Sequence, residues 1–320
     1  MSLFEKTKRL DEELLGSSHD PKDPRMGEVI KYHPEDLNSA EVVILGCPED
    51  KGVIRNKGRP GARRGPTEIR RAFYKLALDD HIHSQSIFDI GDVVLGKTLE
   101  ETHENLRSVV RSLLEQGKLI LVLGGGNDIS YPDCAALTDV KRDVLVFNID
   151  KHFDVRDISP RNSGTAYRQL LELGLIDPEK FYEMGFETFA NSPVYEKYLK
   201  RKGVNIFSLD EMRTKGIASF FEEILKKNTY DAVFWGIDMD VMRDADAPGV
   251  SSSYPTGMTA QEIMAIMEIA GRYTSFGVVE FTEVNPDVDI DNRTSKLTAI
   301  LIHTFLSSRE LDKDRIRSLA

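Results

Sequence analysis

The chain has 320 residues, with 42 basic and 53 acidic side chains and a formal net charge of -11 at pH 7. Hydrophobic residues make up 40% of it, which is enough for a sizeable core and excludes a wholly disordered chain. The acidic balance argues against a nucleic-acid partner, because phosphate binding needs clustered positive charge.

The N-terminal segment MSLFEKTKRLDEELLG is charged throughout, so we expect no secretory signal there. No uncharged apolar stretch reaches the roughly 20 residues that a membrane-spanning helix needs, so we expect no membrane partner. Two cysteines, Cys47 and Cys134, cannot form a disulfide framework, and a cytoplasmic protein is predicted. Without repeats or linkers, we expect a single domain over residues 1–320, with residues 1–40 as an N-terminal extension packed on it.

From residue 41 onward, short apolar runs alternate with segments of helical spacing, for example residues 98–117, 259–272 and 296–305. This alternation requires crossover connections and therefore predicts a mainly parallel sheet. A closed barrel and an open doubly wound sheet are both compatible with it, and both place function at the carboxyl ends of strands. Eight runs are apolar enough to be strands covered on both faces: 42–46, 86–93, 119–125, 143–149, 180–186, 204–209, 231–237 and 276–281.

Ionisable side chains follow two of these expected strands. Asp150, His152 and Asp154 come after residues 143–149, and Asp238 and Asp240 come after residues 231–237. Residues at i and i+2 share one face of an extended chain, so each set points one way. Clustered carboxylates repel each other and resist burial unless something compensates them. We therefore predict a divalent metal site; solvated turn acids are the alternative.

The chemistry of this set indicates which metal it would hold. The four aspartates supply four negative charges, which two divalent ions would balance. An oxygen-rich set with one imidazole suits manganese better than metals that prefer thiolates. Two ions that share carboxylates would lower the pKa of a bridging water and provide a nucleophile for hydrolysis.

A glycine run, Gly124–Gly125–Gly126, follows another expected strand and leads to Asn127. The GxGxxG pattern and the lysine of a P-loop are both absent, so nucleotide binding is not predicted. The last expected strand leads to Glu280 and Glu283, which adds further carboxylates at the same edge of the sheet.

Together these motifs resemble the ureohydrolase family, which comprises arginases, agmatinases and formimidoylglutamases. The family's Asp-Ala-His-x-Asp motif matches residues 150–154, with Lys151 in place of alanine and expected to point away from the site. Its Ser-x-Asp-x-Asp motif matches residues 236–240, and its Glu-Val-x-Pro motif matches residues 283–286. The resemblance implies an arginase-like α/β fold: an open three-layer α/β/α sandwich with a mainly parallel eight-stranded sheet. It also implies two Mn²⁺ per subunit and hydrolysis of a C–N bond at an amidine or guanidine carbon.

Within the family the chain looks most like the formimidoylglutamases, which split N-formimidoyl-L-glutamate into L-glutamate and formamide in histidine degradation. Residues 50–62, 162–168 and 185–192 resemble segments of that branch. Arginases and agmatinases place a histidine in the second of these segments, where this chain has none. The resemblance therefore implies a metal-dependent hydrolase of a linear amidine.

The resemblance also implies roles for single residues. Asp154 would carry a proton to the departing nitrogen, and Glu283 would pair with the cationic amidine of the substrate. Arg168 is the first choice for a substrate carboxylate, which a guanidinium grips bidentately, and Asn56 and Arg59 are weaker candidates. Six metal ligands are implied, with Asp150 and Asp238 shared by both ions: Asn127, Asp150, His152, Asp154, Asp238 and Asp240.

Asn127 departs from the family pattern, which has a histidine ligand at this position. An asparagine offers only its amide oxygen, a weaker donor toward transition metals. One of the two metal positions is therefore expected to bind less tightly, or the site to hold one ion. A catalytically impaired family member is one alternative, which would hold metal or ligand without turnover.

A second alternative is a ureohydrolase of another guanidino compound, such as a guanidino acid or agmatine. The missing loop histidine argues against arginine and agmatine but leaves a guanidino acid open. The substrate in every case is a small molecule. Members of this family usually assemble into trimers or hexamers, so the resemblance implies a homo-oligomer.

Overall fold

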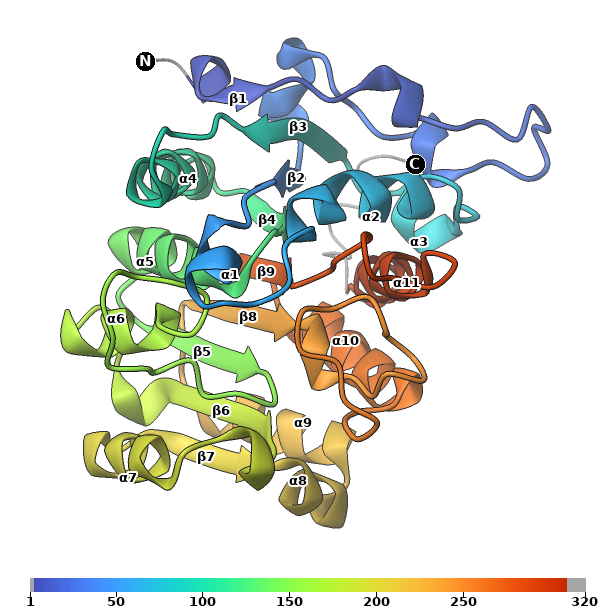
Figure 1. Ribbon diagram of the computed structural model, residues 1–320. Helices are drawn as coiled ribbons and strands as arrows, with labels where there is room; N and C mark the ends of the chain where they lie inside the picture. The colour runs from blue at the N-terminus through green and yellow to red at the C-terminus, as the bar shows by residue number, and fades with distance from the viewer. Residues whose placement is uncertain (1–2, 310–320) are drawn as a thin grey trace.

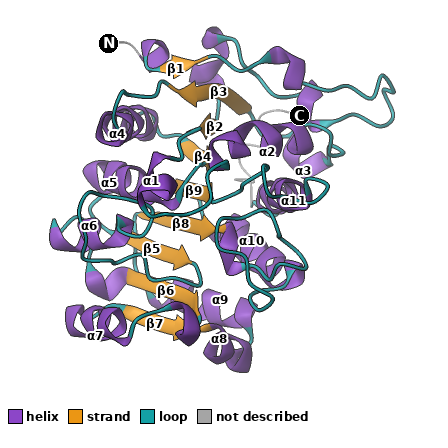
Figure 2. Ribbon diagram, in the orientation of Figure 1, coloured by secondary structure: helices purple, strands orange, loops and turns teal. Residues whose placement is uncertain are grey.

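The computed structural model describes residues 3–309, which form three layers around one open nine-stranded sheet (Figures 1 and 2). The strand order is β1-β3-β2-β4-β9-β8-β5-β6-β7, and every neighbouring pair is parallel except β1 and β3. The strands are β1 (Thr7–Lys8), β2 (Val42–Gly46), β3 (Ile87–Val93), β4 (Leu119–Leu123), β5 (Val144–Ile149), β6 (Phe181–Phe186), β7 (Asn205–Ser208), β8 (Ala232–Asp238) and β9 (Gly277–Thr282).

The eight predicted strands are confirmed as β2 to β9, and the prediction of eight is one strand short. The ninth strand, β1, has only two residues and pairs antiparallel with the end of β3, Thr7 opposite Val93. So short a strand has no periodicity to detect. The sheet ends at β1 and β7 and does not close, which excludes the barrel.

Helices cover both faces of the sheet, as Figure 1 shows, and this explains why most of its parallel strands are apolar throughout. One face carries α4 (Leu99–Glu115), α5 (Ser130–Val140), α6 (Ala166–Glu172) and α7 (Pro193–Lys202). The other face carries α2 (Gly65–Phe73), α3 (Asp80–His83), α8 (Leu209–Lys215), α9 (Ile217–Lys227), α10 (Ala260–Tyr273) and α11 (Arg293–Ser307). The short helix α1 (Lys51–Arg55) lies instead beyond the carboxyl end of β2.

The three helices expected from apolar spacing are confirmed as α4, α10 and α11. Two of them begin with a capping box, in which a threonine and a glutamate three residues later satisfy each other's backbone N–H groups: Thr98 with Glu101, and Thr259 with Glu262. Helix α4 ends just before Gly117, whose φ of 76° suits glycine.

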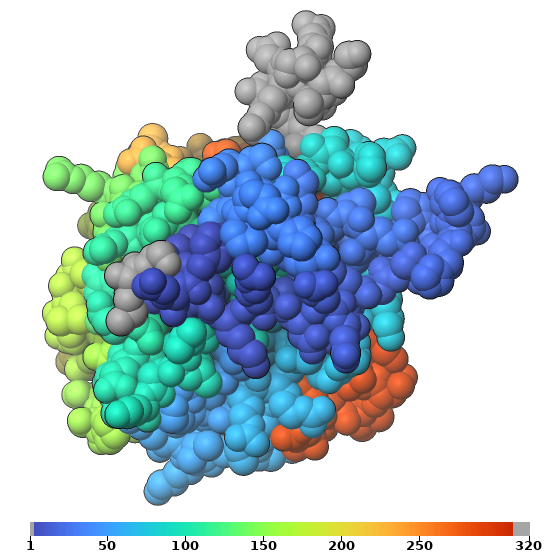
Figure 3. Space-filling view, turned by 90° about the horizontal axis from the view of Figure 1, so that it is seen from above, coloured from blue at the N-terminus to red at the C-terminus, as the bar shows by residue number. Residues whose placement is uncertain are grey.

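The N-terminal residues pack along the β1 edge of the sheet. Figure 3 looks onto this edge, where they lie across the molecule in dark blue. Leu10, Leu14, Met26 and Ile30 are buried in the same core cluster as the side chains of α2. No helix within residues 3–309 is both long and apolar enough to cross a bilayer.

The centre of the sheet combines strands that are far apart in sequence. Strand β9, the last in the chain, pairs with β4 on one side and with β8 on the other, and β8 pairs with β5. Their carboxyl ends therefore meet at one edge, where ligands bind in open parallel sheets.

Candidate metal centre

The predicted ligands meet at the carboxyl ends of these four central strands. Asp150 follows β5, Asp238 ends β8, and Asn127 follows β4 through the glycine run. Glu283 follows β9 directly. Parallel pairing thus brings together side chains that are up to 156 residues apart, since Asn127 N–H donates to Glu283 Oε1 at 3.0 Å.

The acidic side chains form two groups whose ligand atoms lie within 4.8 Å of one another. One group contains Asp150, His152 and Asp240, and the other contains Asp150, Asp154 and Asp238. His152 Nδ1 lies 3.4 Å from Asp150 Oδ1 and 3.2 Å from Asp240 Oδ2. Asp150 belongs to both groups, as a bridging ligand would.

Burial makes the negative charge of this cluster costly. Burial and the neighbouring carboxylates raise the pKa of Asp150 to about 6, that of Asp154 to about 8, and that of Asp238 well above its usual value. Although burial opposes its charged form, Asp240 and Asp150 raise the pKa of His152 to about 12. Burial likewise opposes ionisation of Asp240, but His152 lowers the pKa of Asp240 below its usual value.

The donor set fits divalent cations. Within residues 3–309, no lysine or arginine forms an ion pair with these four aspartates, and the buried Asp240 Oδ1 has no hydrogen-bond partner. Several buried carboxylates and one imidazole, without enough protein cations to balance them, are what a hard or borderline metal ion requires. These residues can therefore hold metal. A bound cation would also explain why so many carboxylates lie together at this site.

Asn127 presents the opposite end of its amide from the one expected. Its Nδ2 donates to Asp154 Oδ2 at 2.6 Å and points to Asp150 Oδ2 at 3.5 Å. Its Oδ1 accepts from the hydroxyls of Ser130 and Thr282, both at 2.9 Å. In this orientation Asn127 is a hydrogen-bond donor to the carboxylates, and its only metal-binding atom faces away from them.

The glycine run before Asn127 allows the loop after β4 to pack closely against neighbouring backbone. A side chain on Gly125 would put a Cβ 1.8 Å from the backbone oxygen of Glu49, so only glycine fits there. This close approach lets the β4 loop lie against the loop that follows β2. A phosphate-binding role is not needed to explain the three glycines.

Two candidate catalytic residues adopt left-handed backbone conformations that non-glycine residues rarely use. Asp154 has a φ of 45° and Glu283 a φ of 63°. Such conformations cost free energy and concentrate at functional sites. Both side chains line the same cavity. Burial also raises the pKa of Glu283 well above its usual value, and its Oε2 has no partner among the described residues.

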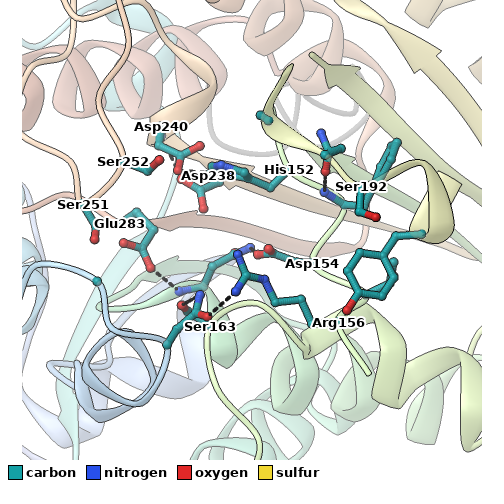
Figure 4. A pocket seen from close by; sticks show the side chains of 18 of the residues that line it. His152, Asp154, Arg156, Ser163, Ser192, Asp238, Asp240, Ser251, Ser252 and Glu283 are labelled. Carbon is teal, nitrogen blue, oxygen red and sulfur yellow. Dashed lines mark hydrogen bonds and ion pairs between the residues drawn. The ribbon is translucent and has the colours of Figure 1, made fainter. Parts of the chain in front are cut away.

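The cavity has a volume of about 470 Å³ and opens beside the acidic cluster. Figure 4 shows His152, Asp154, Asp238, Asp240 and Glu283 around one space, with Arg156 at its border. Other polar groups complete the wall. Ser163 comes from the same loop as Asp154, and three other segments contribute the rest: Asn56, Lys57, Asn191, Ser192, Tyr195, Ser251 and Ser252.

Of the four predicted substrate-binding residues, Asn56 and Glu283 line this cavity, and Arg59 and Arg168 do not. The Arg59 side chain instead donates to the backbone oxygens of Val250 and Ser251. Arg168 lies outside the cavity: its guanidinium pairs with Asp157 at 3.1 Å and with Glu172 at 3.4 Å, and stacks on the ring of Tyr198. The two arginines are thus engaged elsewhere.

Arg156 is the cavity residue that the sequence reasoning missed. It is exposed and lines the cavity, and its Nη1 donates to Asn56 Oδ1 at 3.1 Å. No carboxylate among residues 3–309 pairs with Arg156 or with Lys57, the other basic residue in the wall. The sequence does contain a signal for Arg156. It lies two residues after Asp154 and so continues the i, i+2 spacing of Asp150, His152 and Asp154.

Comparison with known proteins places this architecture in a family. The sequence profile of the arginase family matches residues 40–307. A formimidoylglutamase of Staphylococcus haemolyticus (strain JCSC1435) is 32% identical over 301 residues, covering 91% of this chain and 96% of the relative. One of Bacillus subtilis (strain 168) is 31% identical, covering 91% and 94%.

The fold gives the same answer. The crystal structure of Trypanosoma cruzi formiminoglutamase with Mn²⁺ superposes with a TM-score of 0.84 at 30% identity, covering 90% of this chain and 100% of that one. The profile match spans most of the chain, and the predicted open α/β/α fold is confirmed. This chain belongs to the arginase family.

Proposed function

We propose that this protein is a manganese-dependent formimidoylglutamase, which hydrolyses N-formimidoyl-L-glutamate to L-glutamate and formamide. The observation that carries the proposal is the charge pattern of the cavity. Its floor is a cluster of acidic side chains, and its wall carries the cations Arg156 and Lys57, which have no carboxylate partner in the described part of the chain. The substrate has the complementary pattern, with a cationic amidine at one end and two carboxylates at the other.

The metal would be held by the two acidic groups, with Asp150 shared between them. Bound divalent ions would lower the pKa of a water molecule and supply the nucleophile. Asn127 could join them only through its amide oxygen, which here accepts from Ser130 and Thr282. Its amide nitrogen instead supports the cluster from the side of Asp154.

The remaining chemistry belongs to side chains in the cavity. Glu283 would pair with the amidinium, because its buried Oε2 has no hydrogen-bond partner among the described residues and can accept from a cation in the cavity. Asp154 would take a proton from the attacking water and deliver it to the departing nitrogen, as a half-buried carboxyl beside the reacting atoms can. The left-handed backbone at both residues aims the two carboxyl groups into the cavity.

Arg156 replaces Arg168 as our candidate for holding a substrate carboxylate, with Asn56 orienting its guanidinium. Arg156→Gln should raise KM for formimidoylglutamate about tenfold or more and change kcat little, since it removes a contact made equally in ground and transition states. Arg168→Gln, in the helix α6 that follows this loop, is the matched control and should leave KM unchanged. The reverse ranking of these two variants in steady-state kinetics would remove Arg156 from this role.

The substrate is tested by product analysis. Purified protein loaded with Mn²⁺ is incubated separately with formimidoylglutamate, a guanidino acid and agmatine, and formamide and urea are assayed. We expect formamide from the first and little urea from the others. Agmatine should be poorest, because its ammonium group would face Arg156 and Lys57. Urea as the main product would indicate a ureohydrolase of a guanidino compound. No product from any of the three substrates would indicate a family member that binds metal or ligand without turnover.

We further infer a cytoplasmic homo-oligomer, a trimer or hexamer, built from one domain over residues 1–320. Family membership supports the oligomer. The N-terminal residues add β1 to the edge of the sheet, which supports one domain. Cys47 and Cys134 are free and buried, which fits a reducing compartment. Light scattering on a size-exclusion column would measure the number of subunits.

A further inference from the structure

Asn191 lies in the loop between β6 and α7, and its side-chain amide binds the backbone of the segment 150–154, which carries three of the predicted metal ligands. Its Oδ1 accepts from the Phe153 N–H at 2.9 Å, and its Nδ2 donates to the Lys151 carbonyl oxygen at 2.7 Å. The same Nδ2 donates to the Glu187 carbonyl oxygen at 3.0 Å. Asn191 lines the cavity, but both of its amide hydrogens are used within the protein, so it has no donor left for a substrate.

These hydrogen bonds follow the pattern of a parallel sheet. The regular pairing of β5 with β6 ends at Ile149, which lies opposite Met184. In a parallel sheet, a residue donates to the carbonyl that precedes its opposite residue and accepts from the N–H that follows it. The Asn191 amide makes these two bonds on either side of His152. It therefore takes the place of a strand residue opposite His152, beyond the end of β5.

Support is needed at this point because the backbone leaves the sheet here. Strand β6 ends at Phe186, and Asp154 turns away with a φ of 45°. Backbone groups beyond the end of a sheet lose their regular partners, and a left-handed residue persists only where its surroundings hold it. The Asn191 amide supplies partners directly before the turn. His152 and Asp154, one in each acidic group, therefore depend on the same contact.

The loop that carries Asn191 is itself held on both sides. The Glu187 N–H donates to the Lys151 carbonyl oxygen at 3.2 Å, and Glu187 Oε2 accepts from Thr256 Oγ1 at 3.1 Å. After Asn191, the hydroxyl of Ser192 caps α7 by accepting from the Val194 N–H at 3.3 Å. The amide is thus presented from a fixed position, as a rigid support requires.

We propose that Asn191 is a positioning residue of the metal centre, which holds the backbone of residues 151–153 as a parallel strand would and so keeps His152 and Asp154 in place to bind metal. This inference rests on the proposed metal centre. Carboxylates that gather without their metal repel each other, and a fixed backbone opposes their separation without adding a charge. Loss of the amide should therefore weaken metal binding and slow turnover, while contacts with the substrate remain.

Manganese binding to the metal-free whole protein is measured by titration calorimetry, and kcat and KM are then measured at saturating Mn²⁺. Asn191→Ala should weaken Mn²⁺ binding about tenfold or more, as expected for a residue that orients metal ligands. Its kcat should fall, while KM for formimidoylglutamate should change by less than about twofold.

Asn205→Ala is the matched control. Asn205 Nδ2 also donates to two backbone carbonyl oxygens, those of Glu179 at 2.8 Å and Phe181 at 3.3 Å, but at the amino end of β6. This variant should bind Mn²⁺ as the wild type does. An equal loss of affinity in both variants would overturn the proposal, because the position of the asparagine would then not matter.

Wild-type affinity in Asn191→Ala would also overturn the proposal, as would a rise in KM without a fall in kcat. Should Asn191→Ala fail to fold, Asn191→Asp tests the same point. It keeps the acceptor for Phe153 but cannot donate to Lys151, so it should bind Mn²⁺ more weakly even though its charge attracts cations. Equal or tighter binding by Asn191→Asp would overturn the proposal. Wild-type protein that binds no Mn²⁺ would instead contradict the metal centre itself.

Discussion

Two buried charged clusters in this molecule are built in opposite ways. Arg70 of α2 is 2% exposed, and its guanidinium binds both oxygens of Asp89, at 2.8 and 3.1 Å, and Asp92 at 2.6 Å. Tyr74 adds a hydroxyl donor to Asp89. The acidic cluster gathers three buried aspartates and the partly buried Asp154 around one histidine, and Asp240 Oδ1 has no hydrogen-bond partner among the described residues.

The difference separates structure from function. In the Arg70 cluster the protein supplies its own cation with bidentate geometry, so the cluster serves the fold. In the metal cluster the protein supplies an excess of anions and leaves the balance to ions from solution. The first cluster should therefore govern stability and the second metal binding and turnover.

The largest effect is expected for Asp238→Asn. This change removes a carboxylate that we propose as a metal ligand and should lower turnover about 1,000-fold or more, because the proposed nucleophile depends on bound metal. The metal-free protein should not become less stable, since burial and neighbouring carboxylates make the Asp238 charge unfavourable. Steady-state kinetics and urea unfolding with chelator check both statements. A large loss of stability without metal would contradict the comparison.

Arg70→Met tests the other cluster. It leaves Asp89 buried without its cation and should lower the free energy of unfolding by about 3–5 kcal/mol. Arg107→Met is the control, because Arg107 pairs with Asp139 at a partly exposed site and should cost about 1 kcal/mol or less. Urea unfolding measures the loss of stability in both variants. The fraction of Arg70→Met protein that remains folded should keep the wild-type kcat. Equal costs for the two variants would mean that burial of the pair is unimportant.

Asp154→Asn separates proton transfer from metal binding. If Asp154 carries the proton, turnover should fall on the order of 100-fold. Manganese content, measured by elemental analysis, shows whether the metal remains. Near-normal turnover with metal bound would exclude Asp154 from this step.

The last prediction concerns the pH dependence of stability. The folded-state pKa values of Asp150 and Asp154, about 6 and about 8, lie above their unfolded values near 4. The folded state therefore binds these protons more tightly, and its stabilisation is present below about pH 4 and lost as pH rises through 6 and 8. Each group contributes a slope of up to about 1.4 kcal/mol per pH unit within its window. Unfolding with chelator between pH 5 and 8 should show falling stability; a rise would contradict the assignment.

Much of this architecture could be predicted from sequence because its signals are local. Strands covered on both faces must be apolar, and carboxylates directly after such strands, as at Asp150 and Asp238, have no place in a core. Strand β1 escaped because two residues carry no pattern. The position of β9 between β4 and β8 depends on pairing between distant segments, which periodicity does not contain.

Individual side chains in the site were harder to place. Arg156 and Arg168 lie in the same segment, and which of them faces the cavity depends on the turn at Asp154 and on partners such as Glu172 and Tyr198. The direction of the Asn127 amide depends on two hydroxyls from other elements. Both features are set by tertiary contacts.

The place of β9 in the sheet has a consequence for biosynthesis. Without this strand, β1-β3-β2-β4 and β8-β5-β6-β7 are two separate sheets, and Gly277–Thr282 is synthesised after the other eight strands. A nascent chain that still lacks β9 therefore has no strand that joins its two halves into one sheet. Asn127 and Glu283 can therefore join the side chains that follow β5 and β8 only after β9 has been synthesised.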